Sequence, residues 1–152
     1  MKFLTRICPT IATLVTCLLW TTHSANASEP VTKECVMQVV ATANNHTVTF
    51  ALNNSTAAKA LCDQLPMTIE VEDYGGLEKI FYPPKKLATN DTPLVKKANR
   101  GTLAYYAPWG DVVMFYKPFG AASGLYELGH AIAGGEHIEQ LTGMVEITIV
   151  EE

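Results

Sequence analysis

Short runs of alternating apolar and polar residues, separated by turn signals, constrain this chain more than any other feature. Residues 46–52 (HTVTFAL), 67–72 (MTIEVE) and 143–150 (GMVEITIV) all follow a two-residue period. This period is typical of a β-strand with one buried face, because successive side chains point to opposite sides of a sheet. Several such runs at close spacing predict an all-β fold, either a barrel or a sandwich.

The other runs extend this pattern to about eight strands and two short helices. Strands are expected at residues 34–43, 46–52, 67–72, 78–82, 101–106, 112–116, 125–132 and 143–150. One helix should follow the capping residues 53–56 and end before Pro66, and a second should cover residues 136–141. Pairing of the last strand with the first would close the sheet and remove its edges.

The strand expected at residues 112–116 (VVMFY) is apolar on both faces. Val113 and Phe115 should point to one side of the sheet, and the other three side chains to the opposite side. One face must line the core, and the other must lie under a helix, a loop or a ligand. The surrounding residues 101–120 contain six aromatics. We interpret most of them as barrel wall, because small barrels fill their interiors with side chains.

The first 27 residues have the order of a secretory signal peptide. Lys2 and Arg6 precede an apolar stretch at residues 7–20, and residues 25–27 (ANA) form a cleavage pattern. The apolar stretch is shorter than the roughly 20 residues that a membrane-spanning helix needs. We therefore expect residues 28–152 to form one exported domain, periplasmic or secreted, without a stable membrane span. The alternative is a retained N-terminal anchor.

The expected mature chain is acidic. It keeps nine of the 11 basic residues and all 15 acidic residues, which gives a net charge of −6. Such a chain is a poor match for nucleic acid, because neutralisation of phosphates supplies most of that affinity. Five of the nine cations lie in the polar segment 84–100, which we interpret as a solvated loop: Lys85, Lys86, Lys96, Lys97 and Arg100.

Cys35 and Cys62 are the two cysteines of the expected mature chain. In an oxidising compartment, a disulfide between them would close a loop of about 28 residues and contribute about 3 kcal/mol. The alternative is two separate buried thiols, because sequence spacing does not determine the Cβ geometry.

The sequence gives little support for a metal site. The only cluster of histidines and acids comprises His130, Glu136, His137 and Glu139. A Gly-Gly pair separates the two histidines, and the spacing of a zinc motif is absent. We interpret this cluster as structural and expect neither a metal nor a cofactor.

Four stretches carry a resemblance to a known family. They are residues 57–87 (AAKALCDQLPMTIEVEDYGGLEKIFYPPKKL), 101–117 (GTLAYYAPWGDVVMFYK), 124–131 (GLYELGHA) and the closing strand. Together they resemble the small bacterial proteins of cyclophilin-like fold, often described as domains of unknown function. The resemblance covers nearly the whole mature chain. It implies a closed β-barrel with helices capping its ends.

The resemblance transfers no catalytic residue. True cyclophilins isomerise X-Pro bonds, with an Arg beside a Phe-rich proline pocket in a run resembling FHRIIPxFMxQGGD. The nearest run here, residues 79–84 (KIFYPP), has neither the Arg nor the Gln. The resemblance therefore implies a fold, and a fold does not imply a function.

Our leading functional hypothesis is a non-catalytic module that binds a small molecule or a short peptide. The ligand would lie at a barrel rim formed by residues 105–109 and 119–126. The candidate binding residues are Tyr82, Arg100, Tyr106, Trp109, Tyr116 and Tyr126. Trp109 is the strongest of them, because a large aromatic in a turn has less reason to be buried. We assign the nearby Asp111 carboxylate to the turn.

Two other hypotheses remain open. One is a divergent periplasmic peptidyl-prolyl cis-trans isomerase, in which Arg100 would stabilise the twisted amide. An Arg100 guanidinium within about 4–6 Å of an open aromatic pocket would favour it. The other is a structural partner in an envelope complex, which an exposed apolar patch would support.

Overall fold

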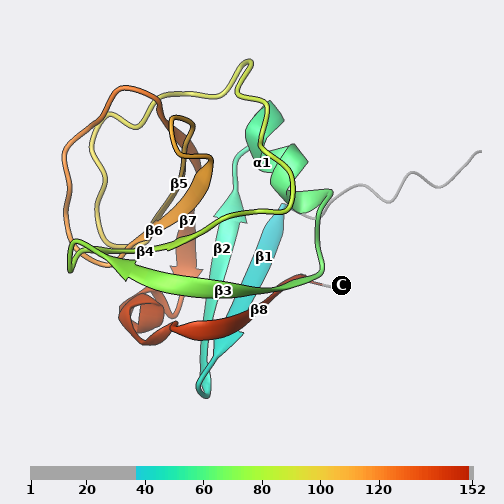
Figure 1. Ribbon diagram of the computed structural model, residues 1–152, viewed down its shortest axis with the longest axis vertical. Coiled ribbons are helices and arrows are strands. Elements are labelled where there is room, and N and C mark those ends of the chain that lie inside the picture. Colours follow the sequence, from blue (N-terminus) through green and yellow to red (C-terminus); the bar gives the residue numbers. More distant parts are fainter. Residues whose placement is uncertain (1–36, 151–152) are drawn as a thin grey trace, which may run out of the picture. The chain divides into compact units, whose positions relative to one another are not determined.

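A computed structural model describes residues 37–150 as a closed antiparallel β-barrel (Figure 1). Its strands are β1 (Gln38–Ala43), β2 (His46–Leu52), β3 (Met67–Tyr74), β4 (Glu78–Phe81), β5 (Thr102–Tyr106), β6 (Asp111–Phe115), β7 (Leu125–Ala133) and β8 (Gly143–Ile149). Their order around the barrel is β1-β2-β7-β5-β6-β4-β3-β8. The predicted all-β closed barrel of about eight strands and two short helices is confirmed. The first and last strands pair with each other, as the sequence pattern suggested.

One face of each strand builds the interior of the barrel. In β2, Val48, Phe50 and Leu52 are buried, while the side chains between them are more exposed. Ile147 of β8 joins the same apolar cluster. Burial of one such side chain contributes about 1.5–3 kcal/mol. The two-residue period of the sequence therefore decides which side chains face inward.

Two short helices add apolar side chains to this interior, and they lie far apart (Figure 1). Helix α1 (Thr56–Cys62) begins after Ser55, whose hydroxyl accepts a hydrogen bond from the Ala58 N–H at 3.3 Å. This bond satisfies one of the amide groups that a helix leaves unpaired at its start. The 3₁₀ helix η1 (Gly135–Gln140) buries Ile138.

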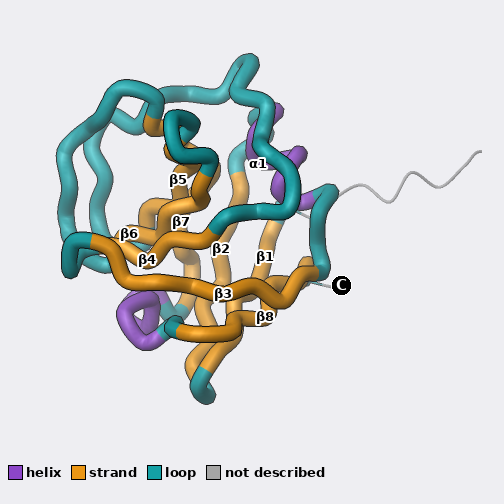
Figure 2. Tube along the Cα trace, viewed as in Figure 1, coloured by secondary structure: helices purple, strands orange, loops and turns teal. Residues whose placement is uncertain are grey.

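A second apolar layer covers the outer face of β4, β5 and β6. Its buried members are Ile80, Val95, Ala98, Ala104, Val113, Phe115 and Leu125. The loops at residues 82–101 and 116–124 lie over this face, and Figure 2 shows them in teal beside these three strands. The two loops are joined by hydrogen bonds from Ala98 N to Gly120 O and from Phe119 N to Ala98 O, both 3.0 Å long. Both faces of β6 are thus buried, as its double-sided apolar pattern requires.

The segment 84–100 is more than a solvated loop. Its five cations are exposed, as expected, but Leu87, Val95 and Ala98 between them are buried. The sparse apolar residues of this segment therefore hold it against the barrel, and the charged residues keep its outer side in water.

In two places, residues expected in a turn belong to a strand. Asp73 and Tyr74, expected in a turn, extend β3 by pairing with Lys79 and Glu78 of β4. Asp111, also expected in a turn, is the first residue of β6 and pairs with Tyr106. The cross-strand hydrogen bonds available in the barrel therefore outweigh the turn preference of aspartate at both positions.

Several predictions concern residues that the structure does not describe. The proposed signal peptide, residues 1–27, and Cys35 lie outside residues 37–150. Cys62 is buried and disulfide-bonded, and its pairing with Cys35 stays a prediction. Within residues 37–150, no helix is both long and apolar enough to cross a membrane.

Candidate functional site

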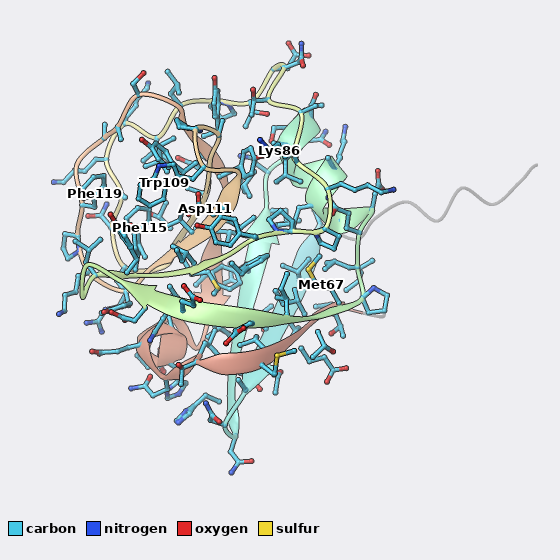
Figure 3. All side chains as sticks on the ribbon, in the orientation of Figure 1. Met67, Lys86, Trp109, Asp111, Phe115 and Phe119 are labelled. Carbon is cyan, nitrogen blue, oxygen red and sulfur yellow. The ribbon has the colours of Figure 1, made fainter. Side chains whose placement is uncertain are left out.

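A pocket of about 250 Å³ lies on the outer face of β4, β5 and β6, where the covering loops leave a gap. Figure 3 shows Trp109, Asp111, Phe115 and Phe119, which all line this pocket, gathered on one side of the barrel. The strand alternation explains its floor. Positions 112 and 114 of β6 face the interior, so Val113 and Phe115 face outward into the pocket.

Aromatic side chains form the rim of the pocket. Trp109, in the turn between β5 and β6, is 48% exposed. Its ring meets that of Tyr74 edge-on at 5.2 Å and that of Tyr106 at 5.5 Å between centroids. Phe119 is 38% exposed and stacks on Phe115 at 5.5 Å. Exposed aromatics that converge on one apolar cavity are typical of a binding surface.

Asp111 brings a buried carboxyl group to this apolar pocket. The residue is 1% exposed, and its Oδ1 has no hydrogen-bond partner among the described residues. Burial raises the pKa of Asp111, while a hydrogen bond from its own backbone N–H acts in the opposite direction. A buried oxygen without a partner destabilises a fold by about 1–3 kcal/mol, so its presence needs an explanation.

Glu78 brings a second carboxyl group to the same pocket. It is the first residue of β4 and lies on the outer face with Ile80, because Lys79 and Phe81 face the interior. Burial raises its pKa to about 7, and the charge of Asp111 adds to this effect. Within residues 37–150, neither Glu78 nor Asp111 forms an ion pair.

Asp73, an exposed acid of β3 that does not line the pocket, has a cation and a hydroxyl as partners. Its Oδ1 lies 3.1 Å from the Lys79 Nζ and accepts a hydrogen bond of 2.7 Å from the Tyr116 hydroxyl. The hydrogen bond from Tyr116, together with Lys79, lowers the pKa of Asp73 despite burial. Burial, reinforced by the bond to Asp73, raises the pKa of Tyr116 to about 12. The buried Lys79 is therefore paired, whereas neither carboxyl of the pocket has a cation as partner within the part of the chain that the structure describes.

The structure brings two of the six predicted ligand-binding residues to the pocket, Tyr106 and Trp109. Tyr116 is buried in the interior cluster. Tyr82 is 52% exposed and lies outside the pocket, and Tyr126 pairs with Tyr105 away from it.

Arg100 is exposed and does not line the pocket. Its Nε donates a hydrogen bond of 3.1 Å to the Tyr116 carbonyl oxygen. The close approach of a guanidinium to an open aromatic pocket, which the isomerase hypothesis required, is therefore not seen at Arg100.

Sequence reasoning missed both carboxyls of the pocket. Asp111 was assigned to the turn, but it is buried at the start of β6. A signal for Glu78 was present, since it shares the outward-facing register of the apolar Ile80. A charged residue in such a register lies on a covered face, and it is then either paired or functional.

The histidine and acid cluster does not converge. His130 is exposed, and the ring of His137 lies 4.9 Å from that of His46. Among residues 37–150, no group of three or more His, Cys, Asp or Glu side chains is placed to hold a metal ion.

The raised pKa of Glu78 predicts that this residue destabilises the fold at neutral pH. In the unfolded chain the Glu78 carboxyl loses its proton near the ordinary pKa of 4.5, whereas in the folded chain it keeps the proton up to about pH 7. Stability contributed by the protonated group is therefore lost as the pH rises between these two values. We expect Glu78→Gln to raise the free energy of unfolding by about 1–2 kcal/mol at about pH 8, with little change at about pH 4.

Urea denaturation followed by circular dichroism at both pH values measures this difference. Glu70→Gln, an exposed carboxyl on β3, is the control for the loss of one charge, and it should change stability by less than about 0.5 kcal/mol. Equal stability of Glu78→Gln and the native protein at the higher pH would contradict the burial of this charge.

Comparisons with known proteins agree with this architecture. The sequence profile of the cyclophilin-like family matches residues 41–150. No curated protein matches the chain. The solution structure of the hypothetical protein AF2241 from Archaeoglobus fulgidus superposes with a TM-score of 0.57 at 17% identity, over 78% of this chain and 99% of that one. At this identity the likeness concerns the fold alone. Because the family profile covers most of the barrel, the chain belongs to the cyclophilin-like family.

Proposed function

We propose that this chain is an exported, non-catalytic domain that binds a small molecule or a short peptide in the pocket beneath Trp109. One observation supports this most: an apolar cavity of about 250 Å³ is lined by a carboxyl whose Oδ1 has no partner among the described residues. Mostly apolar pockets with a few polar groups are typical of ligand sites. N-terminal sequencing of the mature protein tests the export, and an intact first residue would contradict it.

The energetics of the pocket favour a ligand over a purely structural explanation. Trp109 and Phe119 keep 48% and 38% of their surface exposed. Removing apolar surface from water contributes about 25 cal/mol of favourable free energy per Å². The Oδ1 of Asp111 has no partner among residues 37–150, although a hydrogen bond would stabilise it. A ligand that covers the rings and donates a hydrogen bond to Asp111 would remove both costs.

The isomerase hypothesis has less support than binding. An isomerase needs a donor for the twisted amide, and the expected one, Arg100, bonds to the Tyr116 carbonyl outside the pocket. The carboxyls that do line the pocket are acceptors when ionised. A protease-coupled proline-peptide assay should therefore show the uncatalysed rate, and acceleration that Trp109→Ala abolishes would contradict the binding proposal.

Trp109→Ala is expected to weaken ligand binding at least about tenfold, because an aromatic anchor at a pocket mouth carries a large share of the contact. The strongest binder from a panel of small aromatic and aliphatic compounds, tested on the purified protein, serves as the probe. Heteronuclear NMR should place its chemical-shift changes on the pocket residues Val113, Phe115 and Leu125.

Tyr82→Ala is the matched control for this experiment. Tyr82 is an aromatic residue of similar exposure, 52% against 48% for Trp109, but it lies outside the pocket. Its loss should leave the affinity within about twofold of the native value. If no compound perturbs the pocket residues at millimolar concentration, or if the two variants weaken binding equally, the proposal fails.

A further inference from the structure

We propose that the ligand of this pocket is a protonated amine carried on an apolar body, with its ammonium group against the Asp111 carboxyl. This inference rests on the proposed function, since it names the chemical class that the same pocket takes. Three features of the pocket support it: a buried acid whose Oδ1 has no partner and a second acid without a paired cation, both judged over residues 37–150, and an aromatic rim.

The unpaired oxygen of Asp111 sets the first requirement. Ionised carboxylates accept hydrogen bonds and cannot donate them, so the ligand group that meets Asp111 must be a donor. A charged donor is favoured over a neutral one, because hydrogen bonds that involve two ionised groups are stronger and shorter. The gain is greatest in an apolar pocket, where screening by water is weak.

The charge balance of the pocket sets the second requirement. Glu78 and Asp111 both line it, the charge of Asp111 acts on Glu78, and no Lys, Arg or His of residues 37–150 forms an ion pair with either. Elsewhere the chain does pair a buried charge, since the buried Lys79 forms an ion pair with the exposed Asp73. The missing positive charge in the pocket is what an ammonium ligand would bring.

The rim and the floor define the rest of the ligand. Trp109 lies edge-on to both Tyr74 and Tyr106, so three rings border the mouth of the pocket. Aromatic faces attract organic cations, and the attraction is strongest for Trp. The floor beneath them, Val113 and Phe115, offers only apolar contact. An amine with an aromatic or aliphatic body satisfies the rim, the floor and the acid at once.

A metal ion fits the same pocket poorly. Ca²⁺ needs six to eight oxygen ligands, and Zn²⁺ prefers nitrogen and sulfur. The pocket offers two carboxyls. Asp111 pairs with Tyr106 and Glu78 pairs with Phe115, so the two carboxyls flank Val113 instead of sharing one point. The remaining lining is largely apolar, which suits an organic cation.

Phenethylamine and phenethyl alcohol form a matched pair of probes that differ in the ammonium group. Isothermal titration of the native protein should show binding of the amine at least about tenfold tighter than that of the alcohol. In Asp111→Asn this preference should disappear while the alcohol binds as before. Binding of the alcohol as tight as that of the amine would overturn the inference, yet the proposed function would stand. Binding of neither probe, nor of any compound in the panel, would end both.

The pH dependence of amine affinity provides an independent readout, which a purely structural role of Glu78 would not produce. The charged and titratable groups around Glu78 lie on several neighbouring segments: Asp111 on β6, Tyr74 on β3, Tyr106 on β5, and Tyr116 and Lys117 directly after β6. The Lys117 Nζ donates a hydrogen bond of 2.8 Å to the Gly76 carbonyl oxygen. A cationic ligand favours the ionised Glu78, so amine affinity should rise several-fold between about pH 6 and about pH 8, where the amine stays protonated.

Glu78→Gln should remove this rise, and phenethyl alcohol should show none. A rise that persists in Glu78→Gln, or that the alcohol shares, would overturn the assignment of an ammonium ligand. Phenylalanine amide and its N-acetylated form distinguish the two sources of such a group. Tighter binding of phenylalanine amide than of phenethylamine indicates the N-terminus of a peptide, and the reverse order indicates a free amine. If N-acetyl phenylalanine amide binds as tightly as phenylalanine amide, the proposal is overturned.

Discussion

Replacement of Gly129 by alanine is expected to destabilise the barrel by about 3–4 kcal/mol, which is a large share of the stability of a small domain. Gly129 lies in β7 between two strands, opposite Leu52 of β2 and Leu103 of β5. A Cβ at this position would overlap the Ala51 carbonyl oxygen and come within 2.9 Å of the Leu52 Cα. Both neighbours are backbone atoms, so relief requires β2 and β7 to move apart.

Gly120→Ala is the matched control, because a Cβ there meets no atom within 4 Å. It should change the free energy of unfolding by less than about 0.5 kcal/mol. Urea denaturation of both variants, followed by circular dichroism, gives the comparison. Similar midpoints for the two variants would mean that β2 and β7 are not held as closely as the register indicates.

Phe50→Ala is expected to cost about 3–5 kcal/mol, because it removes a large side chain from the centre of the barrel and leaves a cavity. Phe50 is 1% exposed and lies among the interior side chains of β2. Its neighbours across the sheet, Val39 and Ala131, are held by strand pairing and cannot collapse into the space. The measurement is again the urea midpoint at constant denaturant slope.

Phe119→Ala is the control that shows whether the cost of Phe50→Ala comes from its interior position or from the loss of a phenylalanine at any position. Phe119 is 38% exposed in the loop over the pocket, so its removal should cost less than about 1 kcal/mol while widening the mouth of the pocket. A cost for Phe119→Ala equal to that for Phe50→Ala would contradict the view that the barrel interior carries most of the stability.

The strands were predictable because their signal is local. Residues 46–52 and 143–150 alternate, because one face of each strand lines the closed interior and the other face is more exposed. The boundaries were less predictable at Asp73 and Asp111. Both residues favour turns by themselves, and only the partner strand shows that they extend a ladder.

The candidate site was predictable only in part. The exposed aromatic turn pointed to Trp109, and Tyr106 follows from its place beside that turn. The other four candidates lie outside the pocket, because adjacent residues of a strand point to opposite faces of the sheet: Tyr82, Arg100, Tyr116 and Tyr126. Tyr74 and Phe119 reach the pocket from segments distant in sequence, which no local pattern reveals.

The amino-acid sequence alone determined the class of the fold, the number of strands and which face of each strand is buried, because these depend on side-chain order over a few residues. Only the tertiary structure decided that two loops cover the outer face of β6 incompletely, and that Glu78 and Asp111 share the gap with no paired cation among the described residues. That outcome depends on long-range packing, because the burial of a charge is a property of everything around it.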